Sequence, residues 1–475
     1  MADVIGYEEK DPRILAAMGS GYPRFFEHAF LSELKRRWHE SGLLPSGCPV
    51  LTARAETIEA VVAYVGETPL ARGAHRGLGW LVYPDQNEPA CCRARAFLQH
   101  TGTGPTSRQI EDILVAEGWR EQVTEETTRP GSEADVVAAL APAFRVPESH
   151  LILAQGGMNA IYATFATINR LLRPEGRYRW VQLGWLYVDT IKMLKTMCLA
   201  GGEPIVWSDV FNLKGLAAKL RPIRHEIAGI VTEVPTNPLI QTPDVVALRA
   251  LADELGCPLV LDPSVASVAN VDVSRWADVV VASLTKYTAR SGDVMLGAAA
   301  VHPDRRWSEA LMNGIRSVRV PPYQRDLERL NAELVGWEAF ATHTSQVCAE
   351  VAIFLENHPK IERVWWAGQA LARDGYRRIA NDKQPRWGGV LSFSINGSME
   401  AFYDAMEVAK GPSFGTRFSL MAPFIYLAHY ELVKTAAGRA QLAACGLDPS
   451  LIRLSIGDES AADLIARLDA ALAHA

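Results

Sequence analysis

Asp278-Val-Val-Val-Ala-Ser-Leu-Thr-Lys286-Tyr-Thr-Ala-Arg-Ser-Gly-Asp293 contains a run of β-branched residues that ends in hydroxyl side chains and one lysine. Such a run is typical of a buried strand that delivers its last residues to a site. Burial lowers the pKa of a lysine and makes its amine a better nucleophile toward an aldehyde. Lys286 is therefore a candidate for a Schiff base, and Ser283 and Thr285 can present hydroxyl groups to a phosphate. Taken alone, the stretch fits a surface lysine on a loop about equally well.

The composition is that of an ordinary globular protein. The chain has 475 residues, 48% of them hydrophobic and 21% charged, which is enough for two or three domains. A net charge of -6 gives no basic footprint for nucleic acid, and no apolar run is long enough to span a bilayer. We therefore expect small-molecule partners and copies of the same chain, with no nucleic acid and no membrane.

The seven cysteines are odd in number and scattered, which does not indicate a disulfide framework. The first ten residues are acidic and lack the apolar segment of a signal peptide. We expect a reduced protein in the cytoplasm. The histidines and cysteines show no metal-binding spacing, so no metal site is predicted.

Short apolar runs alternate with helical segments from about residue 132 onward. This alternation predicts a mostly parallel α/β sheet, in which ligands bind outside the carboxyl ends of the strands. Beyond about residue 320 the pattern becomes mainly helical with a few polar strands. We predict an N-terminal extension or arm over residues 1–130, a large domain over 131–320 and a small domain over 321–475.

Three strand ends carry residues that fit either a binding site or ordinary structure. Gly156-Gly157-Met158 can open a helix whose first N–H groups bind a phosphate, or can form a plain turn. Tyr187 can stack on a flat ring or pack in a core. Asn237, in Glu-Val-Pro-Thr-Asn-Pro, can donate from its amide or belong to an ordinary turn.

Two charged residues lie within apolar runs. Asp262 follows four apolar residues, and a carboxylate placed there needs a partner. Arg453 lies within Leu-Ile-Arg-Leu-Ser-Ile, where its guanidinium group is suited to the α-carboxylate of an amino acid. The alternative for Arg453 is an edge-strand side chain that reaches to water.

Together these segments resemble the Cys/Met-metabolism family of pyridoxal-phosphate (PLP) enzymes, the cystathionine γ-synthase-like family. Ser283-Leu-Thr-Lys286-Tyr is similar to the lysine motif of the family, and Gly156-Gly157-Met158 stands where the family has Ser-Gly-Met, without the serine hydroxyl. Tyr187-Val-Asp-Thr and Gln99-His-Thr-Gly are similar to the fungal-type cystathionine γ-synthase subgroup. The resemblance covers about residue 95 to the end.

The resemblance implies PLP-dependent transferase fold type I, the aspartate-aminotransferase type, with a smaller C-terminal α+β domain. It implies pyridoxal 5'-phosphate as the cofactor and Lys286 and Tyr187 as catalytic residues. The implied cofactor contacts are Gly156, Gly157, Met158, Tyr187, Asn237, Asp262, Ser283, Thr285 and Lys286. Arg453 and Ser413, which begins a segment similar to the family's Ser-Leu-Gly-Gly, are the implied substrate contacts.

The activity implied first is γ-replacement on a γ-activated amino acid such as an O-acyl-homoserine. The alternative is γ-elimination, including loss of a γ-halide to give an unsaturated amino acid as in propargylglycine synthase. A silent scaffold of the same fold predicts loss of Lys286 or Arg453, and both are present.

One family feature is missing. In the family, a Tyr-Ser-Arg segment reaches across a dimer interface to the neighbour's PLP phosphate, whereas this chain has Gln99-His100-Thr101 there. We predict that Arg108, at a helix start a few residues on, makes that charge-assisted contact. We therefore expect a homodimer, or a tetramer built from two dimers, with shared active sites.

Overall fold

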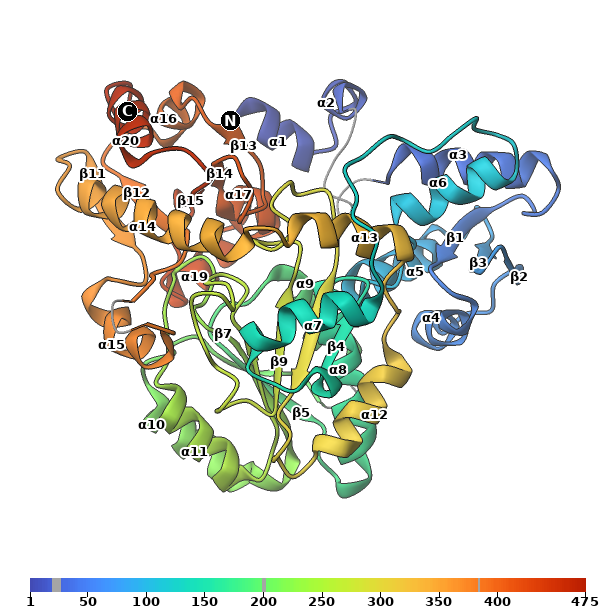
Figure 1. Cartoon of the computed structure of the whole chain (residues 1–475), viewed down its shortest axis with the longest axis horizontal. Helices are drawn as coiled ribbons and strands as arrows, with labels where there is room; N and C mark the ends of the chain where they lie inside the picture. Colours follow the sequence, from blue (N-terminus) through green and yellow to red (C-terminus); the bar gives the residue numbers. More distant parts are fainter. Residues whose placement is uncertain (19–26, 199–201, 383–384) are drawn as a thin grey trace.

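The computed structural model describes residues 1–18, 27–198, 202–382 and 385–475, and Figure 1 shows helices arranged around its sheets. A central seven-stranded sheet has the order β4-β10-β9-β8-β7-β5-β6. Its strands are β4 (Leu151–Ala154), β5 (Arg179–Leu183), β6 (Ile205–Trp207), β7 (Ile227–Glu233), β8 (Leu259–Asp262), β9 (Val279–Ser283) and β10 (Gly297–Val301). β5 through β9 pair in parallel and β10 is antiparallel to both neighbours, so the predicted mostly parallel sheet is confirmed.

Helices cover both faces of this sheet. Successive side chains of a strand point to opposite faces, so Val280 and Ala282 of β9 enter one apolar core while Val279 and Val281 enter another. The first core packs against α7 (Glu133–Phe144), α10 (Leu213–Leu220), α11 (Val245–Leu255) and α13 (Gln324–Glu333). The second packs against α8 (Gly157–Leu172), α9 (Val188–Met197) and α12 (Ser308–Val318). Strands buried on both faces explain the continuous apolar runs in the sequence.

The C-terminal part has its own sheet, drawn in orange and red in Figure 1. Its order is β11-β12-β15-β14-β13, with β11 (Ile361–Trp365), β12 (Val390–Ile395), β13 (Ala409–Lys410), β14 (Leu420–Pro423) and β15 (Ile452–Ser455). Its helices are α14 (Trp337–Glu356), α15 (Ala370–Ile379), α16 (Met399–Ala405), α17 (Phe424–Ala428), α18 (Tyr430–Val433), α19 (Ala436–Ala444) and α20 (Ala461–Leu472). α1 (Ala2–Glu8) and α2 (Pro12–Ala17) lie beside this part, and Met1 joins its core.

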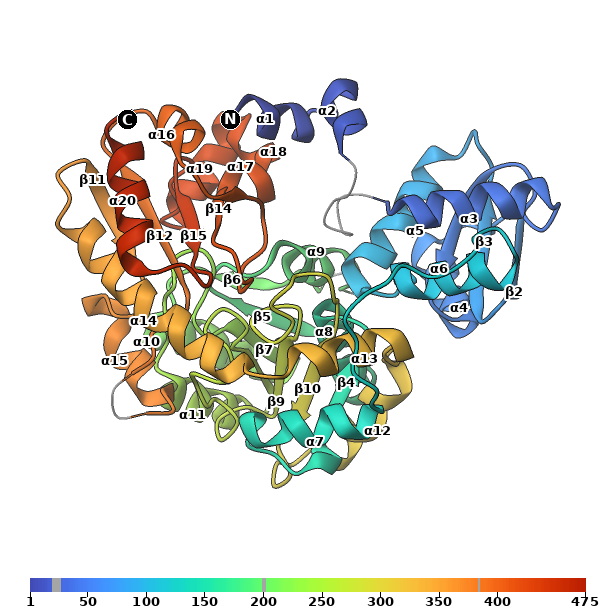
Figure 2. The same ribbon diagram turned by 45° about the horizontal axis from the view of Figure 1, so that its top comes forward.

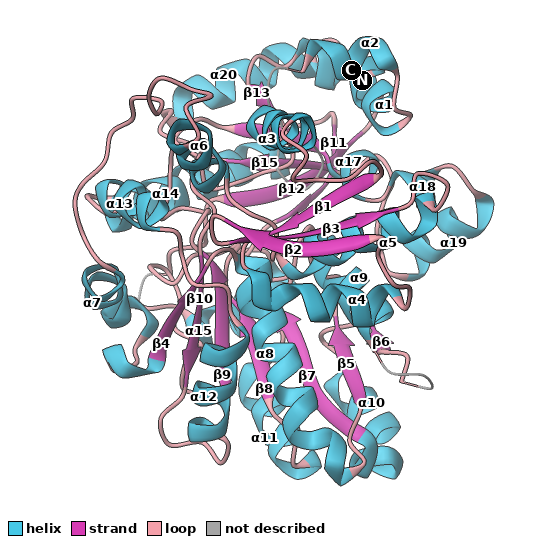
Figure 3. Ribbon diagram, turned by 90° about the vertical axis from the view of Figure 1, so that its right-hand side faces the viewer, coloured by secondary structure: helices cyan, strands magenta, loops and turns pink. Residues whose placement is uncertain are grey.

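The predicted arm contains a small folded unit of its own, which stands apart from the rest in Figure 2. Three antiparallel strands in the order β1-β3-β2 are β1 (Cys48–Thr52), β3 (Leu78–Tyr83) and β2 (Ala71–His75). They are covered by α3 (Ala29–Glu40), α4 (Ile58–Val65), α5 (Glu88–Thr101) and α6 (Ser107–Ala116). Figure 3 shows this sheet above the central one, and α5 contacts β1 as well as α8 and α9. The three-domain division itself stays a prediction.

The expectation of reduced cysteines is wrong for one pair. Cys48 on β1 and Cys91 on α5 form a disulfide, with their Cα atoms 6.3 Å apart. The two residues are 43 positions apart in sequence, and only the packing of α5 on the arm sheet brings them together. Across the described residues, no helix is both long and apolar enough to cross a membrane.

Candidate active site

The predicted site residues gather where the central strands end. Glu233, Asp262 and Ser283 are the last residues of the neighbouring strands β7, β8 and β9. Parallel strands place their carboxyl ends at one edge of the sheet, which is where such sheets bind ligands. Arg453 and Ser413 approach this edge from the C-terminal part.

Lys286 lies three residues beyond β9 and is buried. Its Nζ donates to Ser413 Oγ at 2.7 Å and lies 5.0 Å from the centre of the Phe414 ring. The next residue, Tyr287, has φ +50°, a conformation that side chains other than glycine adopt rarely. Its hydroxyl donates to the Val265 carbonyl at 2.9 Å, so the sharp turn that presents Lys286 is held from the far side. No local sequence pattern indicated this role of Tyr287.

The glycine turn before α8 leaves room for an anion. Gly156 is the N-cap of a sixteen-residue helix with no side-chain cap, and a Cβ added there would meet nothing within 4 Å. Gly157 packs so closely that a Cβ would lie 3.0 Å from the Ser283 Cβ. The free N–H groups and the positive helix end therefore face the hydroxyl side of β9, an arrangement suited to a phosphate. Met158 Sδ accepts from Thr190 at 3.7 Å, and Thr285 is buried.

Asp262 is a buried carboxyl group that accepts the Ser264 N–H at 2.8 Å. Burial raises its pKa to about 6, against the lowering effect of its bonds to Ser264. Within the part of the chain that the structure describes, no lysine, arginine or histidine forms an ion pair with it. A cationic ring nitrogen would supply the missing charge, so the carboxyl fits the pyridine ring of PLP.

Arg453 and Asn237 meet across the two parts of the molecule. Arg453 Nη1 donates to Asn237 Oδ1 at 3.2 Å, and Nη2 donates to the Ser413 carbonyl at 3.0 Å. The guanidinium group lies 5.3 Å and 5.0 Å from the centres of the Phe414 and Phe424 rings. Because the Asn237 oxygen faces Arg453, its amide NH₂ group remains as a donor on the other side.

Tyr187 precedes α9, and its backbone N–H donates to the Glu233 carboxyl group. Two residues on, Asp189 is fully buried and accepts from His100 Nδ1 at 3.0 Å and from Gln99 Nε2 at 3.1 Å. Gln99 and His100 on one side of this contact and Asp189 on the other all differ from the usual family sequence. In the structure these unusual residues pair with each other. Sequence reasoning noted each departure without connecting them, and it did not single out Glu233.

Arg108 does not reach this group of residues. Its Nη1 donates to Asp326 at 2.8 Å, and its Nη2 and Nε donate to Glu126 at 2.6 and 2.9 Å. Nη1 also donates to the Asp293 carbonyl at 3.0 Å. Burial alone would lower the pKa of Arg108, but these carboxylates outweigh burial and raise it. Within one chain Arg108 thus joins Glu126, Asp293 and Asp326, and its contact with a partner's phosphate stays a prediction.

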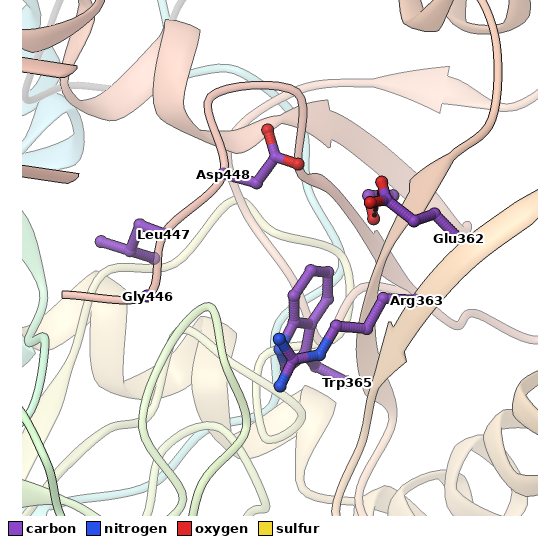
Figure 4. A pocket seen from close by; sticks show the side chains of 7 residues that line it. Glu362, Arg363, Trp365, Gly446, Leu447 and Asp448 are labelled. Atoms are coloured by element: carbon purple, nitrogen blue, oxygen red, sulfur yellow. Dashed lines mark hydrogen bonds between the residues drawn. The ribbon is translucent and has the colours of Figure 1, made fainter. Parts of the chain in front are cut away.

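A cavity of about 330 Å³ lies elsewhere, on the C-terminal part (Figure 4). It is lined by Glu362, Arg363, Trp365, Ser394, Gly446, Leu447 and Asp448, and Figure 4 shows the Arg363 side chain lying against Trp365. None of the predicted site residues lines it, so volume alone does not locate the site. In the described residues, no group of three or more His, Cys, Asp or Glu side chains could hold a metal ion.

Comparison with known proteins identifies the family. The model of a family described as Cys/Met metabolism PLP-dependent enzymes matches residues 147–473. L-2-amino-4-chloropent-4-enoate dechlorinase/desaturase of Streptantibioticus cattleyicolor is 37% identical over 461 residues, which cover 96% of this chain and 91% of that protein. Cystathionine γ-synthase of Neurospora crassa is 31% identical over 328 residues, 67% of this chain and 51% of that protein.

The solved structure of cystathionine γ-synthase from Xanthomonas oryzae, in complex with cystathionine, has the same fold. It matches with a TM-score of 0.62 and 23% identity over 74% of this chain and 88% of that one. The predicted fold type I is confirmed, and PLP is the cofactor of the family, as predicted. The chain belongs to the Cys/Met metabolism family of PLP-dependent enzymes.

Proposed function

We propose that the chain uses PLP to eliminate a leaving group, such as a halide, from Cγ of an amino acid and so to form an unsaturated amino acid. The observation that carries this proposal is the 37% identity to a dechlorinase/desaturase over 96% of the chain, arm included. The substrate named for that relative carries its chlorine on Cγ. γ-Elimination was the alternative from sequence, and it now becomes the first candidate.

When bound, PLP supplies an electron sink for negative charge that develops at the substrate Cα. Gly156, Gly157, Met158, Ser283 and Thr285 would hold its phosphate, and Tyr187 and Asn237 would hold the ring and its oxygen. Asp262 keeps the ring nitrogen protonated because its carboxylate stabilises the adjacent positive charge. The buried position of Asp262 at the strand end supports this assignment.

Arg453 binds the α-carboxylate of the substrate, and the two aromatic rings beside it exclude water from that contact. Lys286 then removes the Cα proton and a proton from Cβ, and the leaving group departs from Cγ with the electron pair of its bond. Lys286 returns one of the two protons to carbon, so that the substrate loses one proton and the leaving group overall. Ser413, which accepts from the Lys286 amine at 2.7 Å, orients this amine. Tyr187 assists proton transfer on the leaving-group side.

γ-Replacement, which the sequence alone favoured, is the second candidate. The 31% identity to a cystathionine γ-synthase supports it. The two outcomes share every step up to loss of the leaving group and differ in whether a thiol then adds at Cγ. Addition of a thiol at Cγ, not cofactor binding, therefore distinguishes them.

The test is to incubate the PLP-loaded chain with L-2-amino-4-chloropent-4-enoate or O-acetyl-homoserine, each with and without cysteine. Elimination predicts one chloride released per substrate consumed, with no need for cysteine, and a product lighter by HCl in mass spectrometry. Lys286→Ala is the control for uncatalysed loss. If chloride stays bound while O-acetyl-homoserine and cysteine combine to a thioether, the second candidate replaces the first.

The assembly and location of the chain are proposals too. A homodimer or a tetramer of two dimers, with sites near the subunit interface, is the arrangement implied by the family resemblance, and a cytoplasmic location fits a small-molecule enzyme. Sedimentation of the PLP-loaded chain measures how many chains the assembly contains. Thiol titration with and without a reductant measures whether the Cys48–Cys91 pair is oxidised in the purified protein.

A further inference from the structure

Glu233 is a buried carboxyl group that the proposed mechanism does not use. It ends β7 directly beside Asp262, its register partner at the end of β8. The backbone N–H groups of Tyr187 and Asn237 both donate to it. One carboxyl group therefore links two segments, 50 positions apart, that carry the residues proposed to hold the cofactor ring.

Two carboxyl groups lie side by side here, while the bound ring offers one cationic nitrogen. Adjacent buried carboxylates cannot both ionise readily, because each charge opposes the other in a medium of low dielectric constant. Burial, and then repulsion from Asp262, raise the pKa of Glu233 well above its usual range, and the N–H groups of Tyr187 and Asn237 and the charge of Arg453 only partly offset this. Burial also raises the pKa of Asp262, to about 6. The pair therefore holds one negative charge more readily than two, and the ring nitrogen proposed to face Asp262 favours that charge on Asp262.

We propose that Glu233 is a positioning residue of the active site. Its neutral carboxyl group fixes the main chain at Tyr187 and Asn237 and leaves the negative charge to Asp262. This inference rests on the proposed roles of these three residues toward PLP, but not on the identity of the leaving group. The rival assignment makes Glu233 a second charged group that faces the ring or Arg453.

The two assignments predict different results for Glu233→Gln, because its amide can accept hydrogen bonds but cannot carry a negative charge. Glu233→Gln keeps an oxygen that accepts the Tyr187 and Asn237 N–H groups but can carry no charge. Glu233→Leu has a similar size and accepts nothing, so both N–H groups lose a buried partner. Asp262→Asn is the matched control, since it makes the same chemical change on the neighbouring strand.

The experiment measures PLP affinity by absorbance titration of the full chain, and solvent-deuterium exchange at Cα of an amino acid without a γ leaving group. Glu233→Gln should stay within about threefold of wild type in both readouts, whereas Asp262→Asn should slow exchange by roughly 100-fold or more. Glu233→Leu should weaken PLP affinity by about 10- to 100-fold, in line with two unsatisfied donors.

A loss of exchange in Glu233→Gln as large as that in Asp262→Asn overturns the proposal, because charge on Glu233 would then be required. Wild-type PLP affinity of Glu233→Leu also overturns it, because the two backbone hydrogen bonds would then contribute nothing to cofactor binding. If Glu233→Leu fails to fold, the pair of amide variants still decides. Neither readout uses a γ leaving group, so failure here is distinct from failure of the proposed elimination.

Discussion

Two regions of the molecule bury charged side chains, and they treat those charges in opposite ways. In the arm, Arg108 is buried against the carboxylates of Glu126 and Asp326, all within one chain. At the strand ends, Arg453 donates to amide and carbonyl oxygens, and Asp262 accepts a backbone N–H. The arm cluster is balanced by its own residues, whereas Asp262 at the strand ends has no ion pair among the described residues.

The contrast separates structural charges from functional ones. A buried arginine matched by carboxylates joins elements distant in sequence, here α6 and α13, and breaking it leaves an uncompensated charge. Asp262 is a buried carboxyl group with a raised pKa and no ion pair among the described residues. Such a group is a candidate for binding or catalysis. We expect mutations in the first region to change stability and mutations in the second to change activity.

Lys286→Ala should give the largest effect on the activity side of this comparison. It removes the amine that takes the Cα and Cβ protons in the proposed mechanism, so turnover should fall by about 10⁴-fold or more. The free energy of unfolding should change far less, because the Lys286–Ser413 hydrogen bond contributes only about 1 kcal/mol. Steady-state rates and urea unfolding of the same preparation measure both quantities. If the loss of stability matched the loss of rate in free energy, Lys286 would not belong to the residues that change activity alone.

Arg108→Met should give the largest effect on the stability side. It leaves Asp326 without its cation and Glu126 with Arg325 as its ion-pair partner, which should cost about 3–5 kcal/mol in the free energy of unfolding. Urea denaturation monitored by circular dichroism measures this cost. The double variant Arg108→Met, Asp326→Leu should recover part of it, because one orphaned carboxylate is then removed. A stable Arg108→Met chain with weak PLP affinity would instead restore the predicted phosphate contact.

Arg453→Lys should lower kcat/KM by about 10- to 100-fold for every amino-acid substrate. The variant keeps the positive charge but loses the planar pair of donors that fits a carboxylate. PLP affinity and thermal stability should stay close to wild type. Rates measured over a series of γ-substituted amino acids test the claim, and an effect confined to one substrate would place Arg453 at the leaving group.

The smallest expected effect is a pH dependence. Without cofactor, the folded-state pKa of Asp262, about 6, exceeds the ordinary aspartate value of 3.8, so the folded chain binds the proton more tightly than the unfolded chain. Stability from this group is therefore lost as pH rises from about 4 to about 6 and is constant above that. Asp262→Asn should remove this slope, worth on the order of 2–3 kcal/mol. Unfolding of both proteins between pH 4 and 7 measures it, and parallel curves would contradict it.

Much of the site could be predicted because a chemical signal marks each strand end. Asp262 and Lys286 each follow a run of apolar residues, where a charge has no reason to lie unless a partner is present. The order of the segments along the chain then allowed Gly157, Asn237 and Arg453 to be matched one by one to motifs of the family. The mostly parallel sheet followed from the same alternation of runs.

The remaining features depend on contacts that no local pattern records. Arg108 meets Asp326 across 218 positions, and Tyr187 meets Glu233 across 46. The turn at Tyr287 depends on an anchor at Val265, and the disulfide depends on how α5 packs against β1. A guanidinium group near a helix start is the same signal whether it binds a phosphate or a carboxylate, so only the folded chain could distinguish the two.

The most direct test of this account is to locate PLP on the chain. The purified protein is incubated with PLP, reduced with borohydride and digested, and the peptides are sequenced by mass spectrometry. The account predicts one pyridoxyl-phosphate adduct per chain, on Lys286, and none in Lys286→Ala. An adduct on another lysine at the same yield, or equal labelling of the variant, would contradict the claim that the strand ends form the PLP site.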